Sequence, residues 1–278
     1  MRFSKGHGTE NDFVVLPDPD GALDLTPALV VELCDRRRGI GGDGVLRVVR
    51  WAALGGGPAP DRAVTWFMDY RNADGSIAEM CGNGVRVFAR YLATTGMEPG
   101  TEFPIGTRAG VRTVRFVGGD REHGDVAVDM GPARLGESSK AGVAGQEFEG
   151  IAVDVGNPHL ACVTDAPLSA LDLTRAPLHD AQLFPDGVNV EFVSPLDGGE
   201  VRMRVHERGV GETRSCGTGT VAAAAAALHH AGRGTGDVVV HVPGGTVRVT
   251  IGEGTSTLQG PAVLVAHGEI TPETSSNR

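Results

Sequence analysis

Short runs of alternating or mainly apolar residues recur along the 278-residue chain and predict β-strands. They are separated by polar segments rich in glycine, a residue typical of tight turns. The clearest strand predictions are 64–71, 112–117, 125–130, 201–206, 238–242, 246–251 and 262–266. Strands therefore dominate the predicted secondary structure.

Two segments have helical character instead. In the first, Val85, Phe88 and Leu92 recur at helical spacing on one face, and Arg86 and Arg90 are expected elsewhere on the helix. The second runs from residue 221 to 228 through six alanines, which have high helix propensity and suit a tightly packed central helix. Glycines at 96 and 232 are expected to end the two helices.

The two helical segments belong to an internal repeat, because each follows a Cys-Gly-x-Gly sequence, at 81–84 and at 216–219. Further anchors occur in the same order and at similar offsets. The equivalent pairs are Asn11 and Asn157, Asp43 and Asp186, and Cys81 and Cys216, at offsets of 146, 143 and 135 residues. A duplicated chain is the simplest interpretation.

The repeat predicts an α+β protein with two pseudo-symmetric domains, each a mixed or antiparallel sheet wrapped around a central helix. The N-terminal half is expected to comprise residues 1–123 plus 265–278 and to carry Cys81. The C-terminal half is expected to comprise residues 124–264 and to carry Cys216. The active site is expected in the cleft between the halves.

Composition narrows the function classes. A formal net charge of −10 argues against nucleic acid and anionic membranes as partners, because both would repel the chain. No apolar run approaches the ~18 residues of a membrane-spanning helix, and the N-terminal residues lack the apolar stretch of a signal peptide. We therefore expect a cytoplasmic protein whose partner is a small-molecule substrate.

The reactive residue types argue against a metal or an organic cofactor. The four cysteines form no CxxC pair, and the nine histidines form no i, i+4 ligand pattern with an acidic neighbour. Lys5 and Lys140 stand beside 23 arginines, in a terminal segment and a polar loop. Pyridoxal enzymes need a lysine for the Schiff base, so this usage weighs against that cofactor. No metal and no cofactor are expected.

Cys81 and Cys216 are the strongest catalytic candidates. A cysteine at a helix N-terminus lies beside unpaired backbone N–H groups and the positive end of the helix dipole, which favour the thiolate. The glycines that follow allow a carboxylate to approach the same N–H groups. A thiolate and a thiol on opposite faces of an α-carbon could remove a proton and return one, inverting the stereocentre. The repeat thus indicates an amino-acid racemase or epimerase.

The sequence resembles the diaminopimelate epimerase family over nearly its whole length. The resemblance is carried by seven blocks: 8–13 (GTENDF), 39–44 (GIGGDG), 71–76 (RNADGS), 80–86 (MCGNGVR), 156–159 (GNPH) with Asn189, 207–213 (ERGVGET) and 215–220 (SCGTGT). It implies cofactor-independent interconversion of LL- and meso-2,6-diaminopimelate in lysine and peptidoglycan-precursor synthesis. Family members are often homodimers, so the resemblance also allows a homodimer.

Carried over to this chain, the family's functional residues fall into three groups. Cys81 and Cys216 resemble the two catalytic bases, and His159 and Glu207 resemble polar groups that support them. The remaining residues resemble substrate contacts through backbone N–H groups or side chains. They are Asn11, Asn72, Gly82, Asn83, Asn157, Asn189, Glu207, Arg208, Gly217 and Thr218. The chain departs from the family at Gly44, where a glutamine is frequent.

Other functions remain open at this point. A proline or hydroxyproline racemase of the same fold would not need to grip a second amino-acid end, against which Arg208 and the asparagines argue. A phenazine-biosynthesis-like isomerase would lack the cysteine pair. A non-catalytic amino-acid-binding protein would need neither thiol, and a cysteine hydrolase would need only one. Cys34 and Cys162 are expected to be buried, structural cysteines.

Overall fold

The computed structural model describes residues 1–54 and 63–271, and the chain divides into two compact units. The first comprises 1–128 and 261–278, and the second comprises 129–260. The predicted division at 123/124 and 264/265 lies a few residues away, because one continuous strand, β7 (Asp125–Gly131), runs through the first boundary. Residues 272–278, assigned by that prediction to the N-terminal half, lie outside the described residues.

The first unit contains two α-helices, one short 3-10 helix and eight strands, if β7 is included, among its described residues. They are β1 (Arg2–Gly8), β2 (Asn11–Pro17), α1 (Pro27–Cys34), β3 (Gly44–Arg50), η1 (Trp51–Leu54), β4 (Trp66–Asn72), α2 (Gly82–Thr94), β5 (Glu102–Thr107), β6 (Gly110–Val117), β7, and β17 (Val263–Glu269).

The second unit contains one α-helix, a 3-10 turn and nine strands. They are β8 (Arg134–Val143), β9 (Gln146–Asp154), β10 (Pro158–Val163), η2 (Leu168–Ala170), β11 (Asn189–Val193), β12 (Glu200–Glu207), β13 (Gly211–Thr213), α3 (Gly217–His230), β14 (Gly236–Val242), β15 (Gly245–Ile251) and β16 (Ser256–Gly260).

Strand pairing repeats between the units. In the first, the order is β17–β1–β2–β3–β4–β5–β6–β7, with β2–β3 and β4–β5 parallel and the other neighbours antiparallel. In the second, the order is β8–β9–β10–β11–β12–β14–β15–β16, with β10–β11 and β12–β14 parallel and the rest antiparallel. The two mixed sheets therefore share one topology, although β17 comes last in the chain and β8 comes first in its unit.

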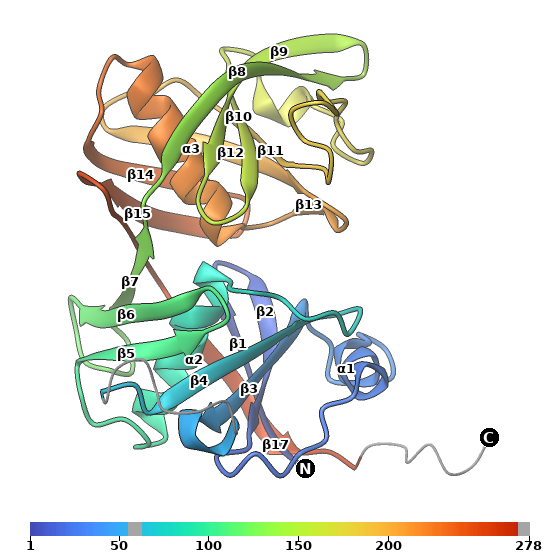
Figure 1. Cartoon of the computed structure of the whole chain (residues 1–278), viewed down its shortest axis with the longest axis vertical. Coiled ribbons are helices and arrows are strands. Elements are labelled where there is room, and N and C mark those ends of the chain that lie inside the picture. Colours follow the sequence, from blue (N-terminus) through green and yellow to red (C-terminus); the bar gives the residue numbers. More distant parts are fainter. Residues whose placement is uncertain (55–62, 272–278) are drawn as a thin grey trace. The chain divides into compact units, whose positions relative to one another are not determined.

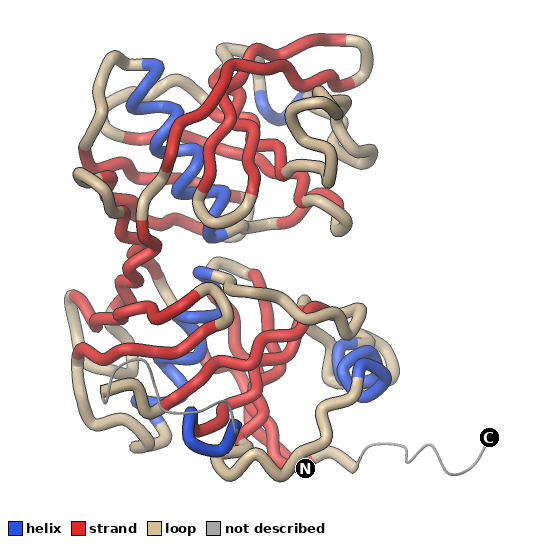
Figure 2. The backbone as a smooth tube through the Cα atoms, viewed as in Figure 1, coloured by secondary structure: helices blue, strands red, loops and turns tan. Residues whose placement is uncertain are grey.

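Each sheet curls around its own helix (Figure 1). In the second unit α3 contacts β9, β10, β11, β12, β14, β15 and β16, and in the first α2 contacts β1, β2, β3, β4, β6 and β17. The tube in Figure 2 shows each of these helices lined by strands along its length. Every residue from Gly82 to Ala93 and from Gly217 to Leu228 is buried. The predicted fold class, an α+β repeat with a helix inside each mixed sheet, is confirmed.

Burial of α2 extends to the two arginines that the helical spacing placed away from its apolar face. Arg86 and Arg90 are 0% and 2% exposed, because the curled sheet leaves the helix no solvent face. Their guanidinium groups bond to backbone carbonyl groups instead: Arg86 Nε donates to Pro261 (3.2 Å) and Arg90 Nε donates to Ala262 (3.0 Å). Buried cations are tolerated only with such partners.

The sequence of α3 explains how this helix fits inside the curled sheet of the second unit. Its six alanines are all buried, and their small side chains let the surrounding strands approach the helix closely. Gly96 and Gly232 follow the two helices with φ of +72° each, the left-handed conformation that glycine favours after a helix end. In the described part of the chain, no helix is both long and apolar enough to cross a membrane.

Candidate active site

Cys81 and Cys216 occupy the same place in the two units. Each is the N-cap residue of its central helix, with extended backbone at φ −139° and −124°. Each sulfur accepts a hydrogen bond from the backbone N–H three residues on, of Gly84 at 3.5 Å and of Gly219 at 3.3 Å. The helix N-termini thus point N–H groups at both sulfurs, which stabilises a thiolate.

Around Cys81, the structure gathers two other predicted site residues of the first unit, Asn11 and Asn83. Asn11 Oδ1 lies 3.5 Å from Cys81 Sγ and accepts a hydrogen bond from Asn83 Nδ2 at 3.2 Å. Asn11 Nδ2 donates to Asp43 Oδ2 at 2.8 Å, which fixes the amide. Asn11 begins β2 directly after a turn in which Thr9 and Glu10 have φ of +50° and +62°. Such non-glycine left-handed residues often mark functional sites.

Asn72 ends β4 opposite Gly44 in the β3–β4 register. Its Nδ2 donates to Ser76 Oγ at 3.0 Å. At Gly44, an added Cβ would lie 2.5 Å from the Arg71 carbonyl oxygen and 2.7 Å from Tyr70 Cε2. This chain therefore has no space for the glutamine that the family often carries there, because Tyr70 and the Arg71 backbone already fill it.

In the second unit, a chain of three hydrogen-bonded side chains, two of them fully buried, lies near the start of α3. His159 Nδ1 lies 2.7 Å from Glu191 Oε1, and His159 Nε2 lies 3.0 Å from Asn157 Oδ1. His159 and Glu191 are both 0% exposed. The structure thus pairs His159 with Glu191. Glu191 is the residue that sequence reasoning missed.

Asn189 and Arg208 lie together at the ends of neighbouring strands. Asn189 Nδ2 donates to the Pro158 carbonyl at 3.1 Å, and Asn189 Oδ1 accepts from the Arg208 backbone N–H at 2.9 Å. The Arg208 guanidinium reaches the Asp186 carbonyl at 3.2 Å. Glu207 Oε1 accepts a hydrogen bond from Thr213 Oγ1 at 2.5 Å. These contacts order the predicted substrate-binding side chains within one unit.

The electrostatic surroundings of the Cys216 and Cys81 thiols differ. Cys216 is buried, and burial raises the pKa of its thiol well above the usual range; the carboxyl groups of Glu207 and Glu191 raise it further. Hydrogen bonds from Thr218, whose Oγ1 lies 3.6 Å from the sulfur, and from the Gly219 N–H act in the opposite direction. Cys216 therefore favours the protonated form in this structure.

Cys81 has a different neighbour, the buried guanidinium of Arg86. Burial lowers the pKa of Arg86 to about 10, and negative charge at Cys81 acts in the opposite direction. By the same reciprocal attraction, a cation at Arg86 favours the thiolate at Cys81. At the position equivalent to Arg86, five residues after the cysteine, the second unit has Val221.

The other two cysteines are buried away from any helix start. Burial raises the pKa of Cys34 to about 11 and that of Cys162 to about 12. Both thiols are free, and Cys162 packs in the core cluster of the second unit. Within residues 1–54 and 63–271, no group of three or more His, Cys, Asp or Glu side chains is arranged to hold a metal ion.

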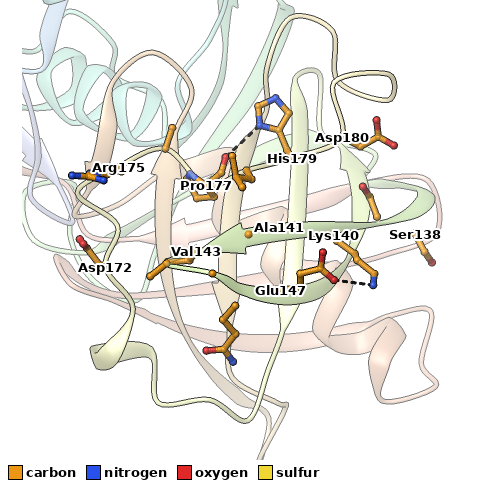
Figure 3. Close-up of a pocket in the computed structure, with 17 residues that line it drawn as sticks. Ser138, Lys140, Ala141, Val143, Glu147, Asp172, Arg175, Pro177, His179 and Asp180 are labelled. Carbon is orange, nitrogen blue, oxygen red and sulfur yellow. Dashed lines mark hydrogen bonds and ion pairs between the residues drawn. The ribbon is translucent and has the colours of Figure 1, made fainter.

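A hollow of about 790 Å³ in the second unit lies elsewhere (Figure 3). It is formed by the β8–β9 hairpin and residues 172–180, and its lining includes Lys140 paired with Glu147 at 3.1 Å. None of the predicted site residues lines it. Its lining includes Ser138, Ser139 and Lys140 but no cysteine and no residue of α3.

A signal for Glu191 was present in the sequence. The run Asn189–Val193 reads as a buried strand, and a glutamate in the middle of such a run is unusual. In the structure all five residues of β11 are buried. A charged residue inside an otherwise apolar buried strand needs a partner, and only the tertiary structure identifies it as His159.

Solved structures with the same fold define the class of protein. A phenazine biosynthesis protein of Bacillus anthracis matches with a TM-score of 0.72 at 13% identity, covering 98% of this chain and 99% of that one. A hydroxyproline epimerase of Agrobacterium vitis matches with a TM-score of 0.67 at 19% identity, covering 97% and 90%. The chain thus has the duplicated α+β fold that these proteins share. In this chain a cysteine lies at the start of each central helix.

Sequence comparison gives the family within that class. The model of the diaminopimelate epimerase family matches residues 3–136 and 151–269. Proteins named diaminopimelate epimerase from Rhodococcus erythropolis and Mycolicibacterium smegmatis are 59% and 58% identical to this chain. The alignments cover 98% of this chain in both cases, and 96% and 97% of the relatives. The chain belongs to the diaminopimelate epimerase family, as its motifs predicted.

Proposed function

We propose that this chain is an isomerase that interconverts LL- and meso-2,6-diaminopimelate, in lysine and peptidoglycan-precursor biosynthesis. Full-length identity of 59% to a protein named diaminopimelate epimerase supports the activity. The structural observation that carries the proposal is the equivalent placement of Cys81 and Cys216, each as the N-cap of a helix enclosed by the same sheet topology. A duplicated thiol has a use in stereoinversion, which needs one group on each face of the α-carbon.

In the proposed mechanism, the two half-sites face one substrate. One cysteine, as thiolate, removes the α-proton and becomes a thiol, while the other, as thiol, gives its proton to the opposite face and becomes a thiolate. The roles exchange in the reverse direction, so no proton is gained or lost overall. Each turnover therefore leaves the pair in the opposite protonation state, and proton exchange with water or with the next substrate of opposite handedness restores it.

The helix N-termini supply the second part of the proposed chemistry. The N–H groups of Gly82, Asn83, Gly217 and Thr218 hold the reacting carboxylate and stabilise the charge that develops as the α-proton leaves. All four residues are buried in the first turns of α2 and α3. Preorganised donors at this point lower the barrier because they need not reorient during the reaction.

The polar side chains around the two thiols are proposed to select the substrate. Asn11, Asn72, Asn157, Asn189 and Arg208 bind it, several of them at the distal amino-acid end. Arginine suits a carboxylate because its guanidinium group can donate two parallel hydrogen bonds. His159 and Glu207 support the catalytic pair. These assignments rest on the family motifs together with the local hydrogen bonds.

The reaction is proposed to need no cofactor and no metal, since two thiols and two helix N-termini supply the acid, the base and the charge stabilisation. The protein is proposed to act in the cytoplasm, where thiols stay reduced, and a homodimer is proposed by analogy with the family. A proline or hydroxyproline racemase is the second candidate, because such an epimerase shares the fold at a TM-score of 0.67. Its 19% identity carries the fold alone.

The deciding experiment is incubation of the purified protein with LL-diaminopimelate in D₂O, with the α-proton followed by NMR. We expect loss of the α-proton signal together with formation of the meso isomer, without added pyridoxal phosphate. L-Proline and trans-4-hydroxy-L-proline serve as control substrates and should show no exchange. Exchange with proline and none with diaminopimelate would transfer the assignment to the second candidate.

A further inference from the structure

The two half-sites differ at two positions that the strand register makes equivalent. Asn11 and Asn157 are equivalent in the repeat, so His159 takes the place of Phe13. Phe13 pairs with Gly44 and His159 pairs with Asn189, so Asn189 takes the place of Gly44, and Asp43 corresponds to Val188 rather than to Asp186 as the sequence spacing suggested. Two residues along the next strand, Glu191 takes the place of Leu46. An apolar pair lies behind the Cys81 helix start, whereas a histidine and a glutamate lie behind the Cys216 helix start.

Glu191 is in direct contact with the start of α3. An added Cβ at Gly219 would lie 2.7 Å from Glu191 Oε1 and 3.2 Å from Cys216 Sγ, so the carboxyl and the thiol both pack against the first turn of α3. The second oxygen, Oε2, is buried and has no hydrogen-bond partner among the described residues. Such a group is unfavourable for folding, and its retention points to a functional role.

The geometry limits the protonation states of the buried pair. With Asn157 Oδ1 as acceptor, His159 Nε2 carries a hydrogen, and one more hydrogen lies between Nδ1 and Glu191 Oε1. The pair is therefore either an imidazolium with a carboxylate or an imidazole with a carboxylic acid. Both forms hold the ring through both nitrogens. In the ionised form it is the carboxylate, through Oε1, that packs against the first turn of α3 beside Cys216.

We propose that Glu191 is a positioning residue of the Cys216 half-site, which orients Asn157 through His159 and keeps the proton on Cys216 when no substrate is bound. The part that concerns Asn157 rests on the proposed function, because it assumes that Asn157 contacts diaminopimelate. The part that concerns Cys216 does not, since it describes the substrate-free protein.

The charged and polar groups on the elements around Cys216 indicate in which direction the pKa of its thiol should change when Glu191 is replaced. Glu191 on β11 and Glu207 at the end of β12 oppose the thiolate, while the N–H of Gly219 and the hydroxyl of Thr218 on α3 favour it. His159 on β10 contacts Glu191 directly. Removing the Glu191 carboxyl removes one of the two opposing acidic groups, so the Cys216 thiol should ionise at lower pH.

The first test titrates Cys216 in the substrate-free full-length protein with Cys81→Ser, by the ultraviolet absorbance of the thiolate. Cys34→Ala and Cys162→Ala are included in the same background, because burial raises the pKa of all three remaining thiols and their absorbances would overlap. We expect Glu191→Gln to lower the midpoint by about one pH unit, a tenfold change in ionisation. An unchanged midpoint would overturn the proposed effect on the Cys216 proton.

The second test measures kcat and KM for diaminopimelate in Glu191→Leu, which copies Leu46 of the other half, and in Glu191→Gln. Leucine cannot bond to Nδ1, whereas the glutamine amide can. We expect KM to rise about tenfold in the leucine variant, as for the loss of one buried hydrogen bond to a binding group, and to return to within about twofold in the glutamine variant. A merely structural role would lower the unfolding temperature without this selective rescue, and that result would overturn the positioning role.

A matched control exists on the surface of the same unit. His241 Nε2 lies 2.7 Å from Glu200 Oε2, a histidine–glutamate pair of the same length as the buried one but partly exposed. Glu200→Gln should leave both the Cys216 titration and the KM unchanged. If the wild-type chain failed to turn over diaminopimelate, the proposed function would fail, and the Cys216 titration would still test Glu191.

Discussion

The Cys81 half and the Cys216 half have one backbone topology and two electrostatic designs. Both present a cysteine at a helix start, but the first has a buried arginine five residues on where the second has Val221. The second has a buried glutamate where the first has Leu46. Arg86 Nη1 and Glu191 Oε2 are both buried without a hydrogen-bond partner in the described part of the chain. A duplicated scaffold thus places two thiols alike and gives them unequal electrostatic surroundings.

The difference teaches how a symmetric reaction can begin from an asymmetric enzyme. Inversion of a stereocentre needs one thiolate and one thiol at the start of each turnover. Two thiols in identical surroundings would favour neither arrangement. Burial and two carboxyl groups favour a thiol at Cys216, whereas the cation at Arg86 attracts negative charge at Cys81, so the two positions are not electrostatically interchangeable.

The largest effect is expected when one of the two cysteines, Cys81 or Cys216, is replaced. Cys81→Ala or Cys216→Ala should each lower kcat for epimerisation by about 10³-fold or more, because one face of the α-carbon loses its acid or base. Cys34→Ala and Cys162→Ala are the controls, and both should retain near-normal turnover. A Cys216→Ala enzyme with substantial epimerase activity would refute the two-thiol mechanism.

The next effect tests the cation behind Cys81. In a Cys216→Ser background, Arg86→Met should raise the pH at which the Cys81 thiolate forms by about one unit, since the nearest buried positive charge is lost. Arg86→Lys keeps the charge and should shift the midpoint much less. The thiolate absorbance measures both. Equal midpoints in the methionine and lysine variants would show that the charge of Arg86 has no influence.

A smaller effect concerns Gly44, whose equivalent in the second half is Asn189. Gly44→Gln should destabilise the fold by about 1–3 kcal/mol through overpacking against Tyr70 and the Arg71 carbonyl. Thermal unfolding measures the loss, and the double variant with Tyr70→Ala should recover part of it. A single variant as stable as the wild type would mean that the space at Gly44 adapts without strain.

The smallest effect is an opposite response of the two halves to acid. Burial alone would raise the pKa of Asp69 in β4, but hydrogen bonds from Arg71 and Arg108 hold it below its usual value. Burial raises the pKa of Glu191. Asp69 therefore stabilises its unit above the unfolded pKa of 3.8 and loses that contribution as pH falls, whereas Glu191 gains its preferred proton as pH falls through its raised folded value.

Hydrogen exchange measures this contrast strand by strand. Between about pH 5 and about pH 3, we expect protection in β3 and β4 to fall relative to β10 and β11, after correction for intrinsic exchange rates. The Glu191→Gln variant is the control, because its β10 and β11 no longer contain the titrating carboxyl. Equal loss of protection in both pairs of strands would contradict the assignment.

Much of the fold was predictable from local patterns. Strands at 201–206, 238–242 and 246–251 lie within β12, β14 and β15, because alternation of apolar and polar residues reports one buried sheet face. Predicted helices at 85–92 and 221–228 lie within α2 and α3. The boundary between the two units, which lies within β7, was harder to predict from the sequence, because a strand that continues from one unit into the other carries no local signal for the division.

Less of the candidate site than of the fold could be predicted from the sequence. Both cysteines, the asparagines and Arg208 followed from the repeat and the family motifs, and their assignment as catalytic and binding residues stays a prediction. The burial of Arg86 did not follow, because helical spacing alone expects an arginine to face solvent. Glu191 did not follow either, since its partner His159 lies 32 residues away in sequence.

By itself, the sequence determined the duplication, the fold class, the family and the two helix-capping thiols, because these depend on spacing and local backbone preference. Tertiary structure decided which charged groups lie behind each thiol. That depends on strand register, which gives Glu191 the position in its unit that Leu46 has in the other, and gives His159 the position of Phe13. Register is fixed by contacts between distant segments, so only the folded chain reveals that the two equivalent cysteines stand in unequal electrostatic surroundings.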